Sequence, residues 1–510
     1  MNIIENPYIS IVHRNLPRLL SLYNLDVTHP LCGCGDRRYW AWKLVDFPNG
    51  TFQGAAFGLS KLLTAGMLPK GIDKVAILRR IEQMISVIPI LTDHKGSLSE
   101  ALPNEGSFCV TGLVLADCLG AINSLDKLID TPRREELIMY LQPLAKFLMC
   151  QDETHGVISN HLATNALAMI RWSKTTNDAE SFKRAKVWLD RIRTHTNQEG
   201  WMLEYTGADP GYQSWGTSAL AQINEISPEL ELQDLLEKSY SFLEKFALPD
   251  GSFANGCGSR MTRFLMAGGA ELQSKKSKSA ARLANFARQF SRSNKFVTLD
   301  SIDELNIVPF FNDTVIAAIN AQDKINETLL EPKTCSFPDA GLYIHKSKKT
   351  VITINIRRGG WISITNLWGS ISTKINQGPV ARSSKGHILR PVRGKLTSHT
   401  RSRMIIQSDL EPVKQILPSP LKFIILRTLS MTIFRSKILG NLVKQLLARI
   451  LLLENKKTIG RVERHIFLSN GIVTDKILSG DIELIADKRG FIPSHMASQG
   501  YWQVGDDSSS

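Results

Sequence analysis

Three carboxylates are the first residues in this 510-residue chain whose types and positions suggest a reaction. Glu204, Asp209 and Asp250 each lie in or beside a short segment that contains glycine. Hydrolysis of a glycosidic bond needs two carboxyl groups that face each other across a cleft. The sequence therefore leaves glycoside hydrolysis open, provided that the fold brings two of these residues together.

Other motifs that carry chemistry are weak. Cys32 and Cys34 form a Cys-Gly-Cys motif with no second pair nearby, so we expect a packed loop and no metal site. The chain has seven cysteines, an odd number that argues against a disulfide framework. Since a Walker loop, a Rossmann fingerprint and a nucleophile elbow are all absent from the sequence, we expect no cofactor.

A repeat in the first half predicts how the loops are positioned. A polar residue, a glycine and a bulky apolar residue recur at glycines that are 56, 50, 44 and 51 residues apart, beginning at Gly50. This period accommodates a pair of helices with their loops. Apolar spacing predicts helices over 55–68, 75–90, 111–128, 134–149, 162–173 and 179–194. We predict an (α/α) toroid over residues 1–335 with the glycine loops at one mouth, and an open α-solenoid as the alternative.

The composition changes near residue 335. Residues 336–510 carry 27 Lys and Arg against 11 Asp and Glu, whereas residues 1–335 carry 35 against 37. Short β-branched runs in the second half predict strands over 340–345, 350–356, 361–365, 462–468, 472–477 and 481–485. The fold class that follows is α + β, with an N-terminal toroid followed by a C-terminal antiparallel β-sandwich over 336–510.

Two basic segments stand out in the second half. Residues 374–403 carry eight basic residues and no acidic one, which predicts a solvated loop or a surface for an anionic partner. Because nucleic-acid motifs are absent, we expect no nucleic acid. Residues 417–455 are predicted to form a basic, apolar helical insert. Its part 421–453 contains no acidic residue, so it either packs on the domains or makes a peripheral membrane contact.

The overall composition also bears on location. Hydrophobic residues make up 43% and charged residues 22%, both ordinary globular values. No apolar run reaches about 18 residues, and the first residues lack the pattern of a secretory signal. We therefore expect a cytoplasmic protein, with peripheral attachment to the inner membrane as the alternative.

Four short stretches resemble the heparinase II/III-like (alginate-lyase-like) polysaccharide lyases. Residues 159–166 (SNHLATNA) resemble the start of an inner helix, and residues 209–213 (DPGYQ) resemble the loop that presents the catalytic tyrosine. Residues 258–260 and 337–341 are similar to a glycine-rich turn and to the entry into the sandwich. The resemblance implies β-elimination on an acidic, uronate-containing polysaccharide.

The resemblance also implies roles for individual residues. The carboxylate of the uronate must be neutralised before its C5 proton can leave, and Asn160 suits this as an amide donor, with help from His161. Tyr212 is the candidate that protonates the leaving C4 oxygen, and it takes the C5 proton as well if the elimination is syn. The residues assigned to substrate binding are Arg260, Tyr205, Arg382, Lys385 and His387. Tyr205 is the rival of Tyr212, and the basic residues would favour a phenolate.

Simpler roles remain open for the main candidates. Asn160 can cap a helix, His161 can be a structural histidine, Tyr212 can pack in the core, and Arg260 can hold its turn. The family's doubled histidine pattern is missing from residues 376–387. This departure favours a protein without catalytic activity, but a lyase is the first prediction. A glycoside hydrolase on the same toroid and a non-catalytic glycan-binding or assembly protein of polysaccharide biosynthesis are the alternatives.

Overall fold

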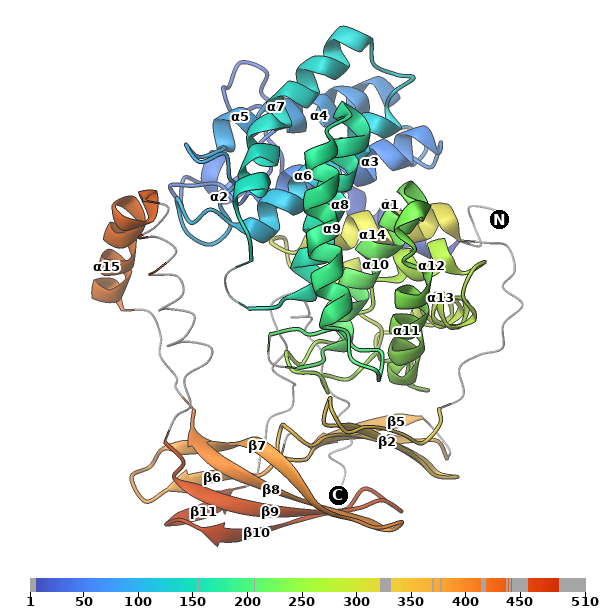
Figure 1. Cartoon of the computed structure of the whole chain (residues 1–510), viewed down its shortest axis with the longest axis vertical. Coiled ribbons are helices and arrows are strands. Elements are labelled where there is room, and N and C mark those ends of the chain that lie inside the picture. The colour runs from blue at the N-terminus through green and yellow to red at the C-terminus, as the bar shows by residue number, and fades with distance from the viewer. Residues whose placement is uncertain are drawn as a thin grey trace.

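The computed structural model divides the chain into a helical first part and a second part built mainly of strands (Figure 1). It describes residues 6–153, 156–205, 207–321, 332–368, 371–376, 378–413, 419–436, 439, 442 and 457–485. The helical part ends with a helix at Asn320, and the first strand begins at Cys335. The predicted α + β layout, with helices first and antiparallel sheets second, is confirmed.

Six helices form the inner wall of a closed ring. They are α3 (Ala55–Thr64), α6 (Phe108–Ser124), α8 (Ser159–Thr176), α10 (Pro210–Ile226), α12 (Ala267–Gln273) and α14 (Ile307–Asn320). Each packs against the next, and α14 packs against α3. Asn312 joins the two ends: its Nδ2 donates to the carbonyl of Gly54 at 2.9 Å, and its Oδ1 accepts from the N–H of Gly58 at 3.0 Å. The helices therefore form a ring rather than an open solenoid.

A second set of helices lies outside this wall. The longer ones are α1 (Pro7–Leu20), α4 (Lys74–Ser86), α7 (Thr131–Cys150), α9 (Ala179–Thr194), α11 (Gln233–Leu243) and α13 (Lys278–Phe290). Short turns of helix are α2 (Arg37–Trp40), α5 (Ile88–Leu91), η1 (Gly50–Gly54), η2 (Pro228–Leu230), η3 (Glu244–Phe246) and η4 (Leu299–Ser301). In α4 only Ile77, Ile81, Met84 and Ile85 are buried, which is one stripe of an amphipathic helix. In α6 nearly every residue is buried, as its inner position requires.

The strands form two antiparallel sheets. The first has the order β1 (Cys335–Phe337), β2 (Leu342–Lys346), β3 (Thr350–Asn355), β4 (Trp361–Asn366) and β5 (Ser372–Asn376). The second has the order β10 (Val473–Ser479), β9 (Gly460–Phe467), β8 (Arg403–Pro412), β7 (Ile388–His399), β6 (Val380–Ser383) and β11 (Ile482–Ile485). Most strands of the first sheet are joined by short turns, so that sheet is a simple meander.

The first sheet is buried on both faces. Val351 and Trp361 belong to the large apolar core of the helical ring. Their neighbours Ile352 and Ile362 point the other way and share a core with Ile406 of the second sheet. This alternation places the five-stranded sheet between the ring and the six-stranded sheet, as Figure 1 shows.

One expectation for the basic segments needs correction. Most of the segment 374–403 is strand rather than solvated loop, because its apolar residues alternate into the sheet interior: Leu389 and Pro391 are buried, and Arg390 between them is exposed. Sequence reasoning missed β7 and β8 altogether. Of the expected insert 417–455, the structure describes α15 (Pro420–Met431) and the 3-10 turn η5 (Ile433–Arg435). Most of the remaining insert lies outside the described residues.

Candidate active site

The loops that lead into the inner helices meet the five-stranded sheet. Glu199, in the loop before α10, accepts a hydrogen bond from the backbone N–H of Asp339 at 3.0 Å. Asn255, in the loop before α12, donates to the hydroxyl of Ser363 on β4 at 3.1 Å. These contacts fix the mouth of the ring against the sheet, and the predicted site residues of the first half lie at this junction.

Glu204 is the residue that organises the start of α8. Its Oε1 accepts from the N–H of Asn160 at 2.8 Å, and its Oε2 accepts from the Asn160 amide at 2.6 Å. The carboxyl group is fully buried, and burial raises its pKa to about 7, against the opposing effect of the Asn160 hydrogen bonds. The Asn160 amide thus serves Glu204 inside the fold, which differs from the expectation that it faces a substrate carboxylate. The helix is capped by Glu204 rather than by Asn160.

His161 is held between two side chains from other loops. Its Nδ1 lies 2.7 Å from Oε2 of the buried Glu153, and it also hydrogen-bonds the side chain of Cys109 near the start of α6. Burial disfavours the charged imidazole, but Cys109 and Glu153 outweigh it, so the pKa of His161 is raised well above its ordinary value. These two contacts therefore favour the charged form of His161.

Arg260 lies against both tyrosines of the predicted site. Its guanidinium carbon is 3.7 Å from the ring centre of Tyr212 and 5.0 Å from that of Tyr205. Asp209, fully buried, places the two partners: it caps α10 by accepting from the N–H of Tyr212 at 3.1 Å, and it accepts from the N–H of Arg260 at 2.8 Å. The stacking puts a fixed positive charge on the faces of two phenols.

Tyr212 is more deeply buried than the sequence suggests. Only 7% of its surface is exposed, and its ring packs on Trp215 at 6.3 Å and edge-on to Phe264 at 5.5 Å. Burial raises the pKa of Tyr212 far above its usual value, although Arg260 lowers it. The positive charge expected beside this phenol is present in Arg260, but burial has the larger effect on the pKa of Tyr212. Tyr212 therefore stays protonated and suits a proton donor rather than a base.

Tyr205 occupies a strained position on the solvent side of Arg260. Its φ of 60° is a left-handed conformation that a bulky side chain rarely adopts, and its N–H donates to the carbonyl of Val157 at 3.1 Å. The side chain is only half-buried. Burial raises the pKa of Tyr205, while His161 and Arg260 lower it. Of the two tyrosines, Tyr205 is the one that a ligand reaches directly.

Two arginines from the sheet also reach this junction. Arg357 and Arg358 occupy the turn between β3 and β4. The Arg358 guanidinium donates to the carbonyl of Ser259, next to Arg260. A Cβ on Gly207 would lie 3.7 Å from Nη1 of Arg357, which places that guanidinium beside the turn that holds Tyr205. The positive charge expected from the sandwich domain thus comes from this turn.

The other predicted binding residues lie elsewhere. Arg382, on β6, and Lys385 and His387, in the turn after it, are exposed. In Figure 1 β6 lies in the outer six-stranded sheet, well away from α10 and its Tyr212. The structure therefore does not bring these three residues together with His161, Tyr205 and Arg260.

The carboxylates considered for hydrolysis have structural partners. Glu204 and Asp209 each cap a helix, as described above. Asp250 accepts from the N–H of Ser252 at 3.1 Å and from the hydroxyl of Thr373 on β5. All three carboxylates are therefore held by partners within the fold. Among the described residues, no group of three His, Cys, Asp or Glu could hold a metal ion.

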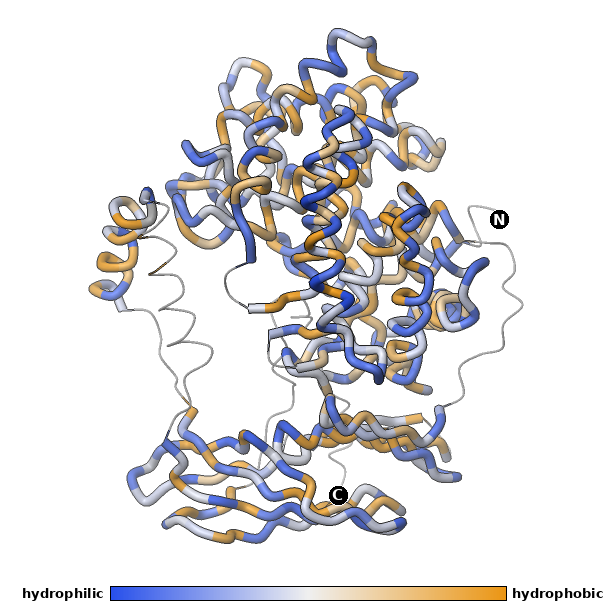
Figure 2. The backbone as a smooth tube through the Cα atoms, viewed as in Figure 1, coloured by the Kyte–Doolittle hydropathy of each residue, from blue (hydrophilic) through white to orange (hydrophobic). Residues whose placement is uncertain are grey.

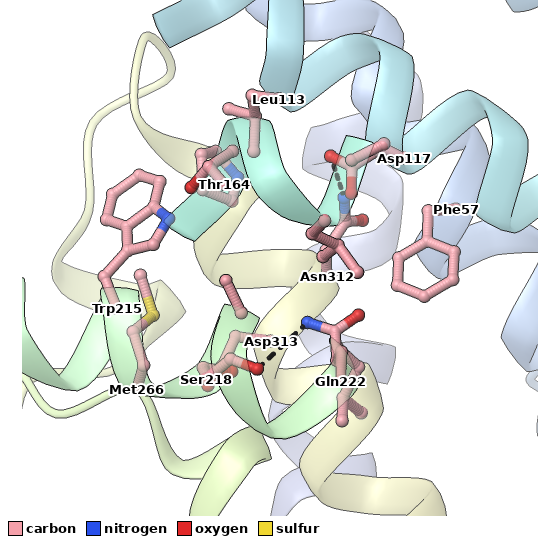
Figure 3. A pocket seen from close by; sticks show the side chains of 15 residues that line it. Phe57, Leu113, Asp117, Thr164, Trp215, Ser218, Gln222, Met266, Asn312 and Asp313 are labelled. Carbon is pink, nitrogen blue, oxygen red and sulfur yellow. Dashed lines mark hydrogen bonds between the residues drawn. The ribbon is translucent and has the colours of Figure 1, made fainter. Parts of the chain in front are cut away.

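A small hollow of about 50 Å³ lies inside the ring (Figure 3). Trp215, which packs on Tyr212, forms part of its wall, so the hollow adjoins the mouth. Two carboxyl groups line it. Burial raises the pKa of Asp117 to about 7 and that of Asp313 to about 6. Asp117 accepts a hydrogen bond from the Asn312 amide at 2.9 Å, and Asp313 accepts one from the N–H of Gly268 at 2.9 Å.

By sequence, the chain matches no family model and no curated protein. By structure, it is similar to the chondroitin AC lyase of Streptomyces coelicolor A3, solved in complex with chondroitin sulphate. The identity is 11% and the TM-score is 0.51, with 80% of this chain and 66% of that chain covered. This chain therefore spans slightly less than two thirds of the lyase. At this identity the similarity shows the fold: a helical ring followed by antiparallel sheets.

Two further structures are less similar. An unsaturated glucuronyl hydrolase specific for heparin gives a TM-score of 0.38 at 13% identity, covering 61% of this chain and 95% of that one. A β-L-arabinofuranosidase of family GH127 from Geobacillus stearothermophilus T6 gives 0.39 at 10% identity, covering 82% and 94%. Both scores are too low to support an inference about this chain.

Sequence reasoning missed four residues of this site. Cys109, in the first turn of α6, and Glu153, in the loop before α8, contact His161, and nothing in their local sequence marks them. Arg357 and Arg358 carried a usable signal, because they directly precede a Gly-Gly turn between two predicted strands. Side chains on such a turn project from the end of a sheet.

Proposed function

We propose that this protein is a glycan-active enzyme of the heparinase II/III-like lyase type, which cleaves a uronate-containing polysaccharide by β-elimination at the mouth of the ring. The observation that carries the proposal is the stack of Arg260 on Tyr205 and Tyr212, beside the charged His161. The similarity in fold to a chondroitin lyase supports it.

The charges at the mouth fit an anionic substrate. Arg260, Arg357, Arg358 and the imidazolium of His161 gather where the loops meet the sheet. A uronate carboxylate paired with Arg260 or His161 would withdraw electron density from C5 and make its proton more acidic. Arginine is well suited to this task because its fork of N–H groups matches a carboxylate.

The two tyrosines would then divide the proton transfers. Burial raises the pKa of Tyr205, and Arg260 and His161 only partly offset that effect. Tyr205, which a ligand can reach, would take the proton from C5 in its phenolate form. The electron pair of the C5–H bond forms the C4–C5 double bond, and the C4–O4 bond breaks. Tyr212, which stays protonated, is the source of the proton for O4, directly or through Tyr205. Asn160 and Glu204 position this group by fixing the start of α8 and the turn before Tyr205.

A non-catalytic glycan-binding protein is the second candidate, and one observation favours it. The Asn160 amide, which sequence reasoning assigned to the substrate carboxylate, is bonded to Glu204. The same cationic mouth would bind an acidic glycan without the proton transfers that cleavage needs.

The test is ultraviolet absorbance during incubation with chondroitin sulphate, heparin and alginate, since elimination leaves a conjugated double bond. We expect rising absorbance with one polymer, lost in Tyr205→Phe and Tyr212→Phe and retained in the control Tyr140→Phe. Tyr140 lies on the outer helix α7, where its hydroxyl contacts Glu136. New reducing ends without absorbance would indicate hydrolysis, and saturable binding without either would indicate the binding protein. Both results would contradict the proposed elimination.

A further inference from the structure

The helix α15 exposes an apolar face on the outside of the ring. Leu421, Ile424 and Ile425 are 67%, 61% and 51% exposed, at the spacing of one helical face. Phe423 and Met431 are exposed as well. Figure 2 shows α15 as a largely hydrophobic coil at the edge of the molecule, and Figure 1 places it beyond α2 and α5. A soluble protein rarely leaves so many large apolar residues of one short helix in water.

The opposite face of α15 is fixed to the ring. The Arg427 guanidinium pairs with Asp46 at 3.1 Å and lies 5.3 Å from the ring centre of Phe47. Asn104 donates to the carbonyl of Ser430 at 3.4 Å. These polar contacts hold the helix with its apolar face outward. The apolar face of α15 is therefore exposed because the polar contacts on its other side attach the helix to the ring.

A loop of the ring extends the same surface. Trp42 and Leu44 are 64% and 75% exposed, in the segment that runs to Asp46 and Phe47, the residues that Arg427 contacts. The guanidinium of Arg37 lies 6.0 Å from the Trp42 ring centre. An exposed tryptophan beside arginine is typical of a membrane–water interface, where the ring lies among headgroups.

The charges around this surface are basic. Lys43 and Lys422 are exposed next to the apolar residues. The acidic residues of the same two segments are already paired, Asp36 with Arg38 at 3.0 Å and Asp46 with Arg427. Among the described residues, no helix is long and apolar enough to cross a membrane.

We propose that α15 and the Trp42–Leu44 loop form a surface that binds the interface of an anionic lipid bilayer. The apolar residues enter the boundary between headgroups and acyl chains, and the lysines pair with lipid phosphates. This proposal is independent of the reaction at the ring mouth, because it uses no residue of that site.

The experiment is flotation of the full chain with two kinds of vesicle, phosphatidylcholine alone and phosphatidylcholine with an equal amount of phosphatidylglycerol. We expect binding only to the anionic vesicles, and weaker binding as salt is raised. The variant Leu421→Ser/Ile424→Ser/Ile425→Ser should bind at least about tenfold more weakly.

The matched control replaces three exposed apolar residues elsewhere on the ring, Leu128→Ser/Met139→Ser/Val187→Ser. It should bind as the wild type does, and circular dichroism should show that both variants are folded. A second variant, Lys43→Glu/Lys422→Glu, keeps the apolar face and should lose the preference for anionic vesicles.

Three results would overturn the proposal. The first would be a wild-type protein that floats with neither kind of vesicle. The second would be a serine variant that binds as tightly as the wild type. The third would be a wild-type protein that is a dimer without lipid while the serine variant is a monomer. That result would mean that a second copy of the chain covers this face.

Discussion

Replacing Glu204 by glutamine is expected to stabilise the protein at alkaline pH and to have a smaller effect at acid pH. The wild-type carboxyl is fully buried, and its pKa is raised from 4.5 to about 7. A carboxyl whose pKa is raised by folding contributes stability below its unfolded pKa and loses it as pH rises through the folded value. A glutamine can keep the hydrogen bonds to Asn160, because both amides can flip, and it does not ionise.

The magnitude follows from the two pKa values. With 4.5 in the unfolded chain and about 7 in the fold, ionisation of Glu204 costs the folded state about 1 kcal/mol at pH 5 and about 3 kcal/mol at pH 8. The free energy of unfolding of Glu204→Gln, relative to wild type, should therefore rise by about 2 kcal/mol between these pH values. Asp117 and Asp313 also titrate in this range, but they are the same in both proteins and cancel in the comparison.

The assay is urea unfolding at pH 5 and pH 8, monitored by tryptophan fluorescence. The slope of the unfolding free energy against urea concentration should be the same for variant and wild type, which shows that the same transition is measured. Glu229→Gln is the control, because Glu229 is on the surface and pairs with Lys174 at 2.9 Å. The control should change stability little at either pH. A difference between Glu204→Gln and wild type that is the same at both pH values would refute the reasoning.

Three further changes test other parts of the structure. Glu153→Gln should lower the pKa of His161, which a histidine NMR titration would detect. An unchanged pKa would mean that Glu153 does not act on the charge of His161. Arg357→Ala should weaken the binding of whichever test polymer the protein takes (chondroitin sulphate, heparin or alginate) and make that binding less dependent on salt, whereas Arg382→Ala should do neither; equal effects on affinity would place the binding surface elsewhere. Asn312→Ala should lower the free energy of unfolding by about 2–4 kcal/mol, because it leaves the partners that close the ring unpaired; urea unfolding measures this, and a loss below about 0.5 kcal/mol would contradict it.

The helices could be predicted from the sequence because their signals are local. The predicted helix 179–194 coincides with α9, whose Asp178 caps the first turn and whose apolar residues repeat at helical spacing. The strand β7 was missed because its exposed positions are largely basic, so it resembles a solvated charge run. Period-two alternation is hard to see when several exposed positions are basic and the register shifts within the strand.

The site could be predicted only in part. Asn160, His161, Tyr205, Tyr212 and Arg260 were found, and the structure brings them together at one mouth. The contact of His161 with Cys109 was not predicted, because it joins helices of different repeats. Hydrogen bonds of this kind depend on how the ring closes, which local sequence does not encode.

The closure of the ring by Asn312 has a consequence for synthesis. Its partners Gly54 and Gly58 lie more than 250 residues earlier in the chain. At about 5–20 residues per second, a ribosome needs roughly 13–50 s to make that stretch. During this time α3 has been made but α14 has not, so the face of α3 that ends against α14 has no native cover. The nascent chain should therefore depend on chaperones most while residues 65–306 are emerging, and an arrest before residue 307 should leave a species that aggregates.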